Sequence, residues 1–283
     1  MKIAISAEST IDLTKELLDK YDIKTVPFTV ILGDEESKDG AVTPKDIFEF
    51  VAKTGVLPKT TALNEFEYEE YFTEILKDYD AVIHFSLSSG LSSSYSHAQA
   101  VAQKMDKVFV IDTEALSTGI ALLAIYARKL TETISDPAQI AQMADERKKF
   151  VQTSYVVEKL DYLYKGGRCS GLALLGANIL KIRPRLVMKD GKMKNDKKYK
   201  GNMPFAVKKY CDECLQEFSD IDTSLAFVTY SSATPEMIEA AKNALISAGV
   251  ETVYETSAGA TITSHCGENT LGILYFNDGK RTL

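Results

Sequence analysis

The sequence predicts an α/β protein in which an N-terminal parallel-sheet domain, with helices on both faces, precedes a C-terminal α+β domain with a mixed sheet. Strand-like and helix-like segments alternate through the first half of the chain, a pattern typical of parallel sheets covered by helices. The second half contains an Asp190-Gly191 pair between two β-rich segments, which predicts a hairpin. The length of 283 residues corresponds to about two domains of ordinary size.

In the first half, we expect strands at residues 3–6, 23–32, 81–87 and 108–112. Helices are expected at residues 12–21, 95–104 and 119–133, with another opening at Asp136-Pro137. Thr43-Pro44 begins a further helix because Thr caps and Pro suits the first helical position. Asn64 and Glu67 resemble a capping box that opens a helix running to residue 77.

In the second half, the expected strands cover residues 153–157, 225–230, 250–256 and 272–277. The hairpin joins residues 185–189 to residues 193–199, and helices are expected at residues 158–164, at 171–182, from Pro204 and from Thr234-Pro235. This mixture of a hairpin with helices predicts the α+β domain. We place the boundary near Phe150, which gives domains of residues 1–150 and 151–283.

Composition excludes several classes of protein. The chain carries 33 basic and 40 acidic residues, a net charge of −7, whereas nucleic-acid binders use a basic surplus to release counterions. No apolar run reaches the roughly 18 residues that span a bilayer. The N-terminus enters a strand without a signal-peptide pattern, so we expect a cytoplasmic protein.

The cysteines and histidines do not predict a metal site. Cys211 and Cys214 form a C-x-x-C, but a structural zinc site needs a second pair of ligands, and the three histidines are scattered. The pair lies in an amphipathic helical segment, so we interpret both thiols as small side chains on one helix face. We expect neither a metal nor a cofactor.

Two hydroxyl-rich segments are the candidate ligand site. Six serines occur between Ser86 and Ser94, after a predicted strand and before a predicted helix. In a parallel sheet, ligands bind beyond the carboxyl ends of the strands, and hydroxyls with free backbone N–H groups at a helix start hold anions. One capping serine would explain only one of the six. Thr60 and Thr61 precede the Asn64 cap and form a second, weaker signal.

The histidines and one arginine differ in their predicted roles. His84 lies in an apolar strand and is interpreted as a hydrogen-bonded core residue, and His97 as a surface or packing residue within a helix. His265, in a polar segment before a glycine, is the best functional candidate. Arg168 follows Gly166-Gly167, a typical helix end, from which we expect its side chain to point outward. No nucleophile elbow or triad pattern is present in the sequence.

Taken together and in order, these segments resemble the DegV family of bacterial fatty-acid-binding proteins over nearly the whole chain. The most specific matches are LDYLYKGGR at residues 160–168 and GANILKIRP at residues 176–184. The other matches are STIDL at residues 9–13, TTALN at 60–64, SSGLS at 88–92 with Tyr95, VIDT at 110–113 with Ser117 and Gly119, and HCG at 265–267. The chain departs from the family pattern at Thr61, Leu63, Asn64, Ser93, Ser94, Glu268 and Asn269.

The resemblance implies a long-chain fatty acid bound between the domains, with its carboxylate held by Thr60 and Ser92 and with Thr61 and Ser93 beside them. His265 would lie close to the carboxylate. Arg168 would work with a fatty acid kinase, whose catalytic subunit phosphorylates the bound carboxyl group to an acyl phosphate. The protein would then be a carrier in phospholipid metabolism, without catalytic residues, in transient contact with a membrane surface.

Two other functions stay open at this point. A small-molecule hydrolase or transferase would use His265 as a general base and the Ser88–Ser94 segment as an anion cradle. A lipid-transfer or storage protein would bind the same acid without a kinase partner.

Overall fold

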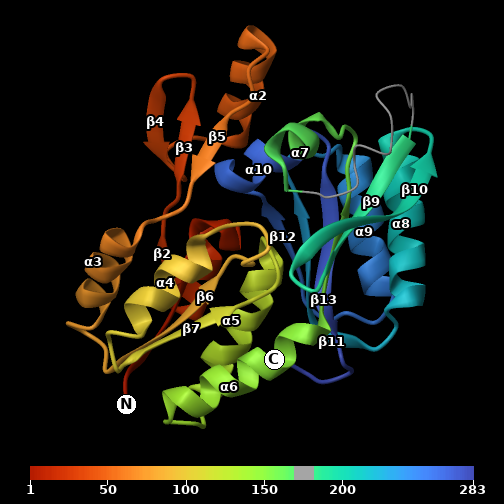
Figure 1. Ribbon diagram of the computed structural model, residues 1–283. Helices are drawn as coiled ribbons and strands as arrows, with labels where there is room; N and C mark the ends of the chain where they lie inside the picture. The colour runs from red at the N-terminus through yellow and green to blue at the C-terminus, as the bar shows by residue number, and fades with distance from the viewer. Residues whose placement is uncertain (169–181) are drawn as a thin grey trace.

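Two large sheets of different design dominate the protein, of which the computed structural model describes residues 1–168 and 182–283 (Figure 1). The first sheet is wholly parallel and has the order β2-β1-β6-β7, with β1 at Ile3–Glu8, β2 at Ile23–Val26, β6 at Ala81–Ser86 and β7 at Val108–Asp112. Its two central strands, β1 and β6, are buried along their whole length, as expected for a sheet covered on both faces. The predicted α/β fold class is confirmed.

Helices between and after these strands cover the sheet. They are α1 (Lys15–Tyr21), α3 (Glu65–Ile75), α4 (Ser94–Ala102), α5 (Thr118–Leu130) and α6 (Pro137–Arg147). The predicted capping box of Asn64 and Glu67 is present. Helix α1 begins at Lys15 and not at Asp12, because Asp12 adopts a left-handed conformation after a short 3₁₀ turn at Ser9–Ile11.

The second sheet is mixed and has the order β10-β9-β8-β13-β11-β12. Its strands are β8 (Val151–Val156), β9 (Ile182–Lys189), β10 (Lys192–Lys200), β11 (Ile221–Tyr230), β12 (Val253–Ser257) and β13 (Leu271–Asn277). Only β11 and β12 pair in parallel. The predicted hairpin is present, and both turn residues, Asp190 and Gly191, have the positive φ that a type I′ turn requires. The predicted helix at residues 171–182 falls on residues outside the described part, apart from Ile182, which begins β9.

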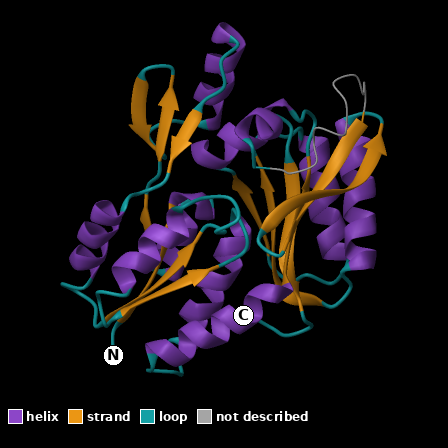
Figure 2. Cartoon of the chain, viewed as in Figure 1, coloured by secondary structure: helices purple, strands orange, loops and turns teal. Residues whose placement is uncertain are grey.

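Helices α8 (Met203–Glu217) and α9 (Pro235–Ser247) pack on the outer face of this sheet, and α5 lies between the two large sheets (Figure 2). Cys211 and Cys214 are buried free thiols on α8, and burial raises the pKa of Cys214 to about 11. The interpretation of the C-x-x-C as core packing is confirmed. Strand β8, the first strand of the second sheet along the chain, begins at Val151, next to the domain boundary predicted near Phe150.

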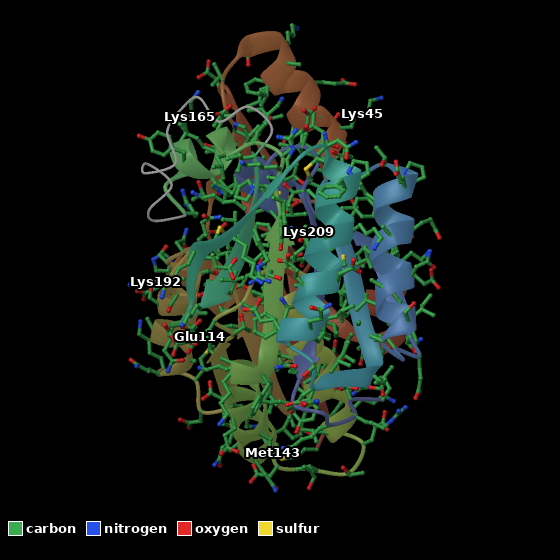
Figure 3. The ribbon with its side chains drawn as sticks, turned by 90° about the vertical axis from the view of Figure 1, so that its right-hand side faces the viewer. Lys45, Glu114, Met143, Lys165, Lys192 and Lys209 are labelled. Carbon is green, nitrogen blue, oxygen red and sulfur yellow. The ribbon has the colours of Figure 1, made fainter. Side chains whose placement is uncertain are left out.

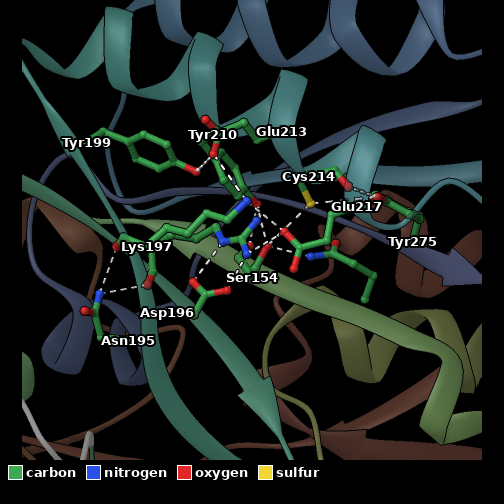
Figure 4. A network of polar contacts seen from close by, with 12 residues as sticks. Ser154, Asn195, Asp196, Lys197, Tyr199, Tyr210, Glu213, Cys214, Glu217 and Tyr275 are labelled. Carbon is green, nitrogen blue, oxygen red and sulfur yellow. Dashed lines mark hydrogen bonds and ion pairs between the residues drawn. The ribbon is translucent and has the colours of Figure 1, made fainter.

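A buried arginine ties the hairpin to α8. Arg185 on β9 is fully buried and forms ion pairs with Asp196 on β10 and Glu217 on α8 (Figure 4). Lys197 extends the network to Glu217, 3.0 Å away, and to Glu213. These contacts fix the hairpin against the body of the second sheet.

The sequence did not predict the third sheet, which has the order β4-β3-β5. Strands β3 (Thr29–Leu32), β4 (Glu35–Lys38) and β5 (Lys59–Thr61) project with α2 (Pro44–Thr54) beyond the parallel sheet (Figure 1). The β-rich segment at residues 23–32 therefore divides at Pro27-Phe28 and supplies strands to two different sheets. Val30 and Ile47 of this unit pack against Ala260 of α10 (Ala260–Cys266).

Candidate functional site

A cavity of about 90 Å³ lies where the two large sheets and the third sheet meet. Its polar walls come from Thr60, Ser92, Ser117, Arg168, Thr229, Ser231, Thr261, His265 and Thr270, and its apolar walls include Phe28, Leu87, Leu91, Leu116, Leu163, Met193, Ile262 and Leu274. Leu87 follows β6 and Ser117 follows β7, so the cavity lies at the carboxyl ends of the parallel strands, as α/β topology predicts. Thr60, Ser92, Arg168 and His265 are thus brought together from distant parts of the chain.

Thr60 and His265 form a hydrogen-bonded pair. Thr60 lies on β5, His265 lies in the last turn of α10, and the Thr60 Oγ1 is 2.7 Å from the His265 Nε2. The His265 Nδ1 is buried and has no hydrogen-bond partner among the described residues. A buried N–H without an acceptor is rarer in proteins than an acceptor without a donor, so we assign the proton to Nε2. In this tautomer Nε2 donates to Thr60, and the Thr60 hydroxyl hydrogen is available to a ligand.

Ser92 presents its hydroxyl in a similar way. The Ser94 N–H donates to the Ser92 Oγ at 3.2 Å, so the Ser92 side chain caps the start of α4. The oxygen is occupied as an acceptor while its hydrogen is available to a ligand. Two hydroxyl donors therefore line one cavity beside a histidine.

His265 is held in its neutral form. Burial, and secondarily the positive charge of Arg168, lowers the pKa of His265 to about 4. Arg168 is half-buried, lines the cavity and donates to the Gly166 carbonyl oxygen at 2.6 Å. The outward orientation that we expected for Arg168 is wrong, because α7 (Asp161–Gly166) ends in a left-handed Gly167 that turns the arginine back over the helix end.

Thr61 and Ser93 lie elsewhere. Both are exposed, and neither lines the cavity. Thr60 and Thr61 are successive residues of β5, whose side chains point to opposite faces. Ser93 is the N-cap residue of α4, although its own side chain makes no capping bond. The expectation that these two residues stand beside the carboxylate site is therefore corrected.

The buried carboxylate of Glu8 holds the serine-rich segment in place through hydrogen bonds. Glu8, at the end of β1, accepts hydrogen bonds from Ser86, Ser94 and Tyr68, each at 2.7 Å, and from the Leu87 N–H at 2.9 Å. Burial alone would raise the pKa of Glu8, but the charge of His84 and these hydrogen bonds outweigh it and lower the pKa to about 2. The sequence analysis missed Glu8, although an acidic residue closing an apolar strand was a visible signal. The core role predicted for His84 is confirmed by its burial.

The turn of the β9-β10 hairpin, in the second half of the chain, contacts the serine-rich segment. The Ser88 hydroxyl donates to the Gly191 carbonyl oxygen at 2.6 Å. A Cβ atom on Gly90 would lie 2.2 Å from that oxygen, so only glycine allows this approach. Lys192 and Glu114 mark the junction in Figure 3.

No group of three or more potential metal ligands occurs within residues 1–168 and 182–283. In the same residues, no helix is both long and apolar enough to cross a membrane.

Comparison with known proteins gives a consistent match. The DegV family, described as a family of uncharacterised proteins, matches residues 2–278. A fatty acid-binding protein from Thermotoga maritima is 28% identical and aligns over 96% of both chains. The DegV protein of Bacillus subtilis is 29% identical, over 97% of this chain and 99% of its own.

Solved structures agree with the sequence matches. A DegV family protein from Thermus thermophilus, described as binding fatty acid, has a TM-score of 0.88 and 25% identity, over 98% of this chain and all of its own. The structure of Bacillus subtilis DegV, described as a fatty acid binding protein, has a TM-score of 0.85 and 26% identity, over 98% of this chain and 99% of its own.

Proposed function

The chain belongs to the DegV family, and from this premise we propose that it binds a long-chain fatty acid with the carboxylate at Thr60 and Ser92. One observation carries the proposal: Thr60 and Ser92 both line the cavity, and with the His265 proton on Nε2 both of their hydroxyl oxygens already accept a hydrogen bond, which leaves both hydroxyl hydrogens available to a ligand. A carboxylate accepts such hydrogen bonds and becomes costly to bury without them. Relatives described as fatty acid binding support the ligand class.

The apolar wall is the expected seat of the acyl chain. About fifteen methylenes at roughly 0.8 kcal/mol each contribute on the order of 12 kcal/mol of gross burial, of which association and ordering of the chain take back much. The cavity, at about 90 Å³, is smaller than the roughly 300 Å³ at which ligand pockets begin. A long chain therefore requires its walls to separate, and the contact between Ser88 and Gly191 is one place where they meet.

We further propose that the protein presents the bound carboxylate to a fatty acid kinase that forms an acyl phosphate. Neutral hydroxyls hold the head group less tightly than a bidentate arginine would, which suits a carrier that hands its ligand on. Arg168 stands at the cavity and would meet the transferring phosphoryl group. The family resemblance supports this step, and the proposed carrier needs no cofactor or metal.

Ligand analysis tests the binding function directly. Native mass spectrometry of gently purified protein should show one long-chain fatty acid per chain, and protein stripped of lipid should rebind a fatty acid in titration. Ligand-free protein that also fails to bind fatty acids would contradict the proposal. A bound acid whose fate is unchanged by the cognate kinase and ATP would favour a lipid-transfer or storage protein.

The geometry argues against the hydrolase alternative. A base with a pKa of about 4 is poorly matched to proton abstraction near neutral pH. His265 also pairs with Thr60 and not with the serine-rich segment, and no carboxylate among the described residues orients its Nδ1. We therefore propose a non-catalytic carrier.

A further inference from the structure

Helix α10 carries His265 but is held by the opposite half of the chain. Two aspartates of the first forty residues accept hydrogen bonds from the backbone at its start. The Asp12 Oδ1 accepts from the Gly259 N–H at 2.8 Å, and Asp39 accepts from the Ala260 N–H at 2.9 Å and the Thr261 N–H at 3.3 Å. The sequence separations exceed 200 residues, so these contacts join the two halves of the cavity.

Both carboxylates are themselves fixed. The Ser117 hydroxyl donates to the Asp12 Oδ2 at 2.5 Å, and the Ser9 hydroxyl donates to the Asp39 Oδ2 at 2.9 Å. Asp12 is 5% exposed and Asp39 9% exposed. Ser117 lines the cavity, so the anchor of α10 is continuous with the cavity wall.

Packing supports the same attachment. A Cβ on Gly259 would lie 3.2 Å from an oxygen of each aspartate, so the two carboxylates close tightly on this residue. Ala260 packs on Val30 of β3 and on Ile47 of α2. Strand β3 belongs to the third sheet, which also carries Thr60 on β5. Both members of the hydrogen-bonded pair at the cavity therefore depend on one anchored unit.

We propose that Asp12 and Asp39 are positioning residues, which hold α10 across the two halves of the chain so that the His265 Nε2 meets the Thr60 hydroxyl. Neither aspartate lines the cavity, so both act through His265. This inference deepens the proposed function and rests on it for the ligand, while the position of His265 can be measured without any ligand.

The test compares Asp12→Ala and Asp39→Ala with a matched control, Asp222→Ala. Asp222 is a buried carboxylate that accepts hydrogen bonds from Ser224 and Thr282 and does not line the cavity. Each variant is examined by ring ¹⁵N NMR of its three histidines, by palmitate titration of the delipidated protein and by thermal unfolding. We expect both anchor variants to shift the His265 resonances and to weaken palmitate binding about tenfold or more. Asp222→Ala should leave the His265 resonances and the palmitate affinity unchanged, even if this variant has a lower melting temperature.

Conservative variants keep the test decisive if the alanine variants do not fold. Asp12→Asn retains an acceptor for the Gly259 N–H and a group that bonds Ser117, so it should bind palmitate within about threefold of wild type. Asp39→Asn retains only one acceptor oxygen for three donors and should shift His265. Unchanged His265 resonances and palmitate affinity in folded anchor variants would overturn the inference, as would an equal shift in the control. If wild-type protein binds no fatty acid, the proposed function fails, while the NMR comparison still decides the positioning role.

Discussion

The half-buried, neutral His265 makes a quantitative prediction about acid stability. The unfolded chain has an ordinary histidine pKa near 6.5, whereas the pKa of His265 in the folded protein is about 4. Between these values His265 takes up a proton in the unfolded chain that it does not bind in the folded protein, so the contribution of His265 to stability falls as the pH drops from about 6.5 to 4. The difference corresponds to about 3 kcal/mol in the free energy of unfolding. A His265→Gln variant has no histidine to protonate at this position. Its free energy of unfolding should therefore decrease by about 3 kcal/mol less than that of the wild type over this pH range.

The assay is urea unfolding of delipidated wild type and His265→Gln at several pH values from 7.5 to 4. Only the difference between the two free energies of unfolding is interpreted, because all other titrating groups are common to both proteins. At pH 7.5 the difference reports the loss of the Thr60 contact alone, and it should move in favour of the variant as the pH falls. A difference that stays constant within about 1 kcal/mol over this range would refute the neutral, half-buried state of His265.

Four further predictions concern the site. Ser92→Ala and Thr60→Ala should each weaken fatty acid binding roughly 10- to 100-fold; a double variant that binds normally in titration would contradict the carboxylate assignment. Arg168→Ala should strongly lower acyl phosphate formation with the cognate kinase, and a wild-type rate would exclude a role in handover. Burial, with the nearby Asp39, raises the pKa of Asp12 to about 8, so the contribution of Asp12 to the free energy of unfolding should decrease as the pH rises from about 4 to 8. In urea unfolding, the stability of Asp12→Asn relative to the wild type should therefore increase by several kcal/mol across that range. Gly90→Ala places a Cβ against the hairpin turn and should speed fatty acid dissociation severalfold in stopped-flow release.

Local rules predicted much of the fold. The Thr43 cap before Pro44, the capping box at Asn64 and the Asp190-Gly191 turn each depend on residues within four positions of one another, so the sequence displays them directly. The division of residues 23–32 between two sheets could not be seen, because both pieces are short strands and their partners lie far along the chain. Short strands carry little register information of their own.

The candidate site divides in the same way. The serine-rich segment, the Thr60-Thr61 pair and His265 stood out in the sequence through their residue types, although His265 lies in the last turn of α10. The choice of Thr60 and Ser92 within the hydroxyl-rich segments came from the family resemblance. The alternation of side chains along a strand would have separated Thr60 from Thr61, had β5 been recognised as a strand. Asp12 and Asp39 were missed because nothing near them in the sequence marks the backbone groups they bind, more than 200 residues away.

The attachment of α10 predicts that this helix unfolds cooperatively with the first half of the chain, although it lies in the second half of the sequence. The helix belongs by connectivity to the second half, between β12 and β13, yet its first backbone amides are bound by Asp12 and Asp39. Amide hydrogen exchange reports such units by their shared opening free energy. The amides of Gly259, Ala260 and Thr261 should therefore exchange with the kinetics of β1 and the third sheet, and not with those of β11 and β12. A fragment beginning at Val151 would lack the acceptors for these amides, so it would leave the His265 segment fast-exchanging even if the mixed sheet formed.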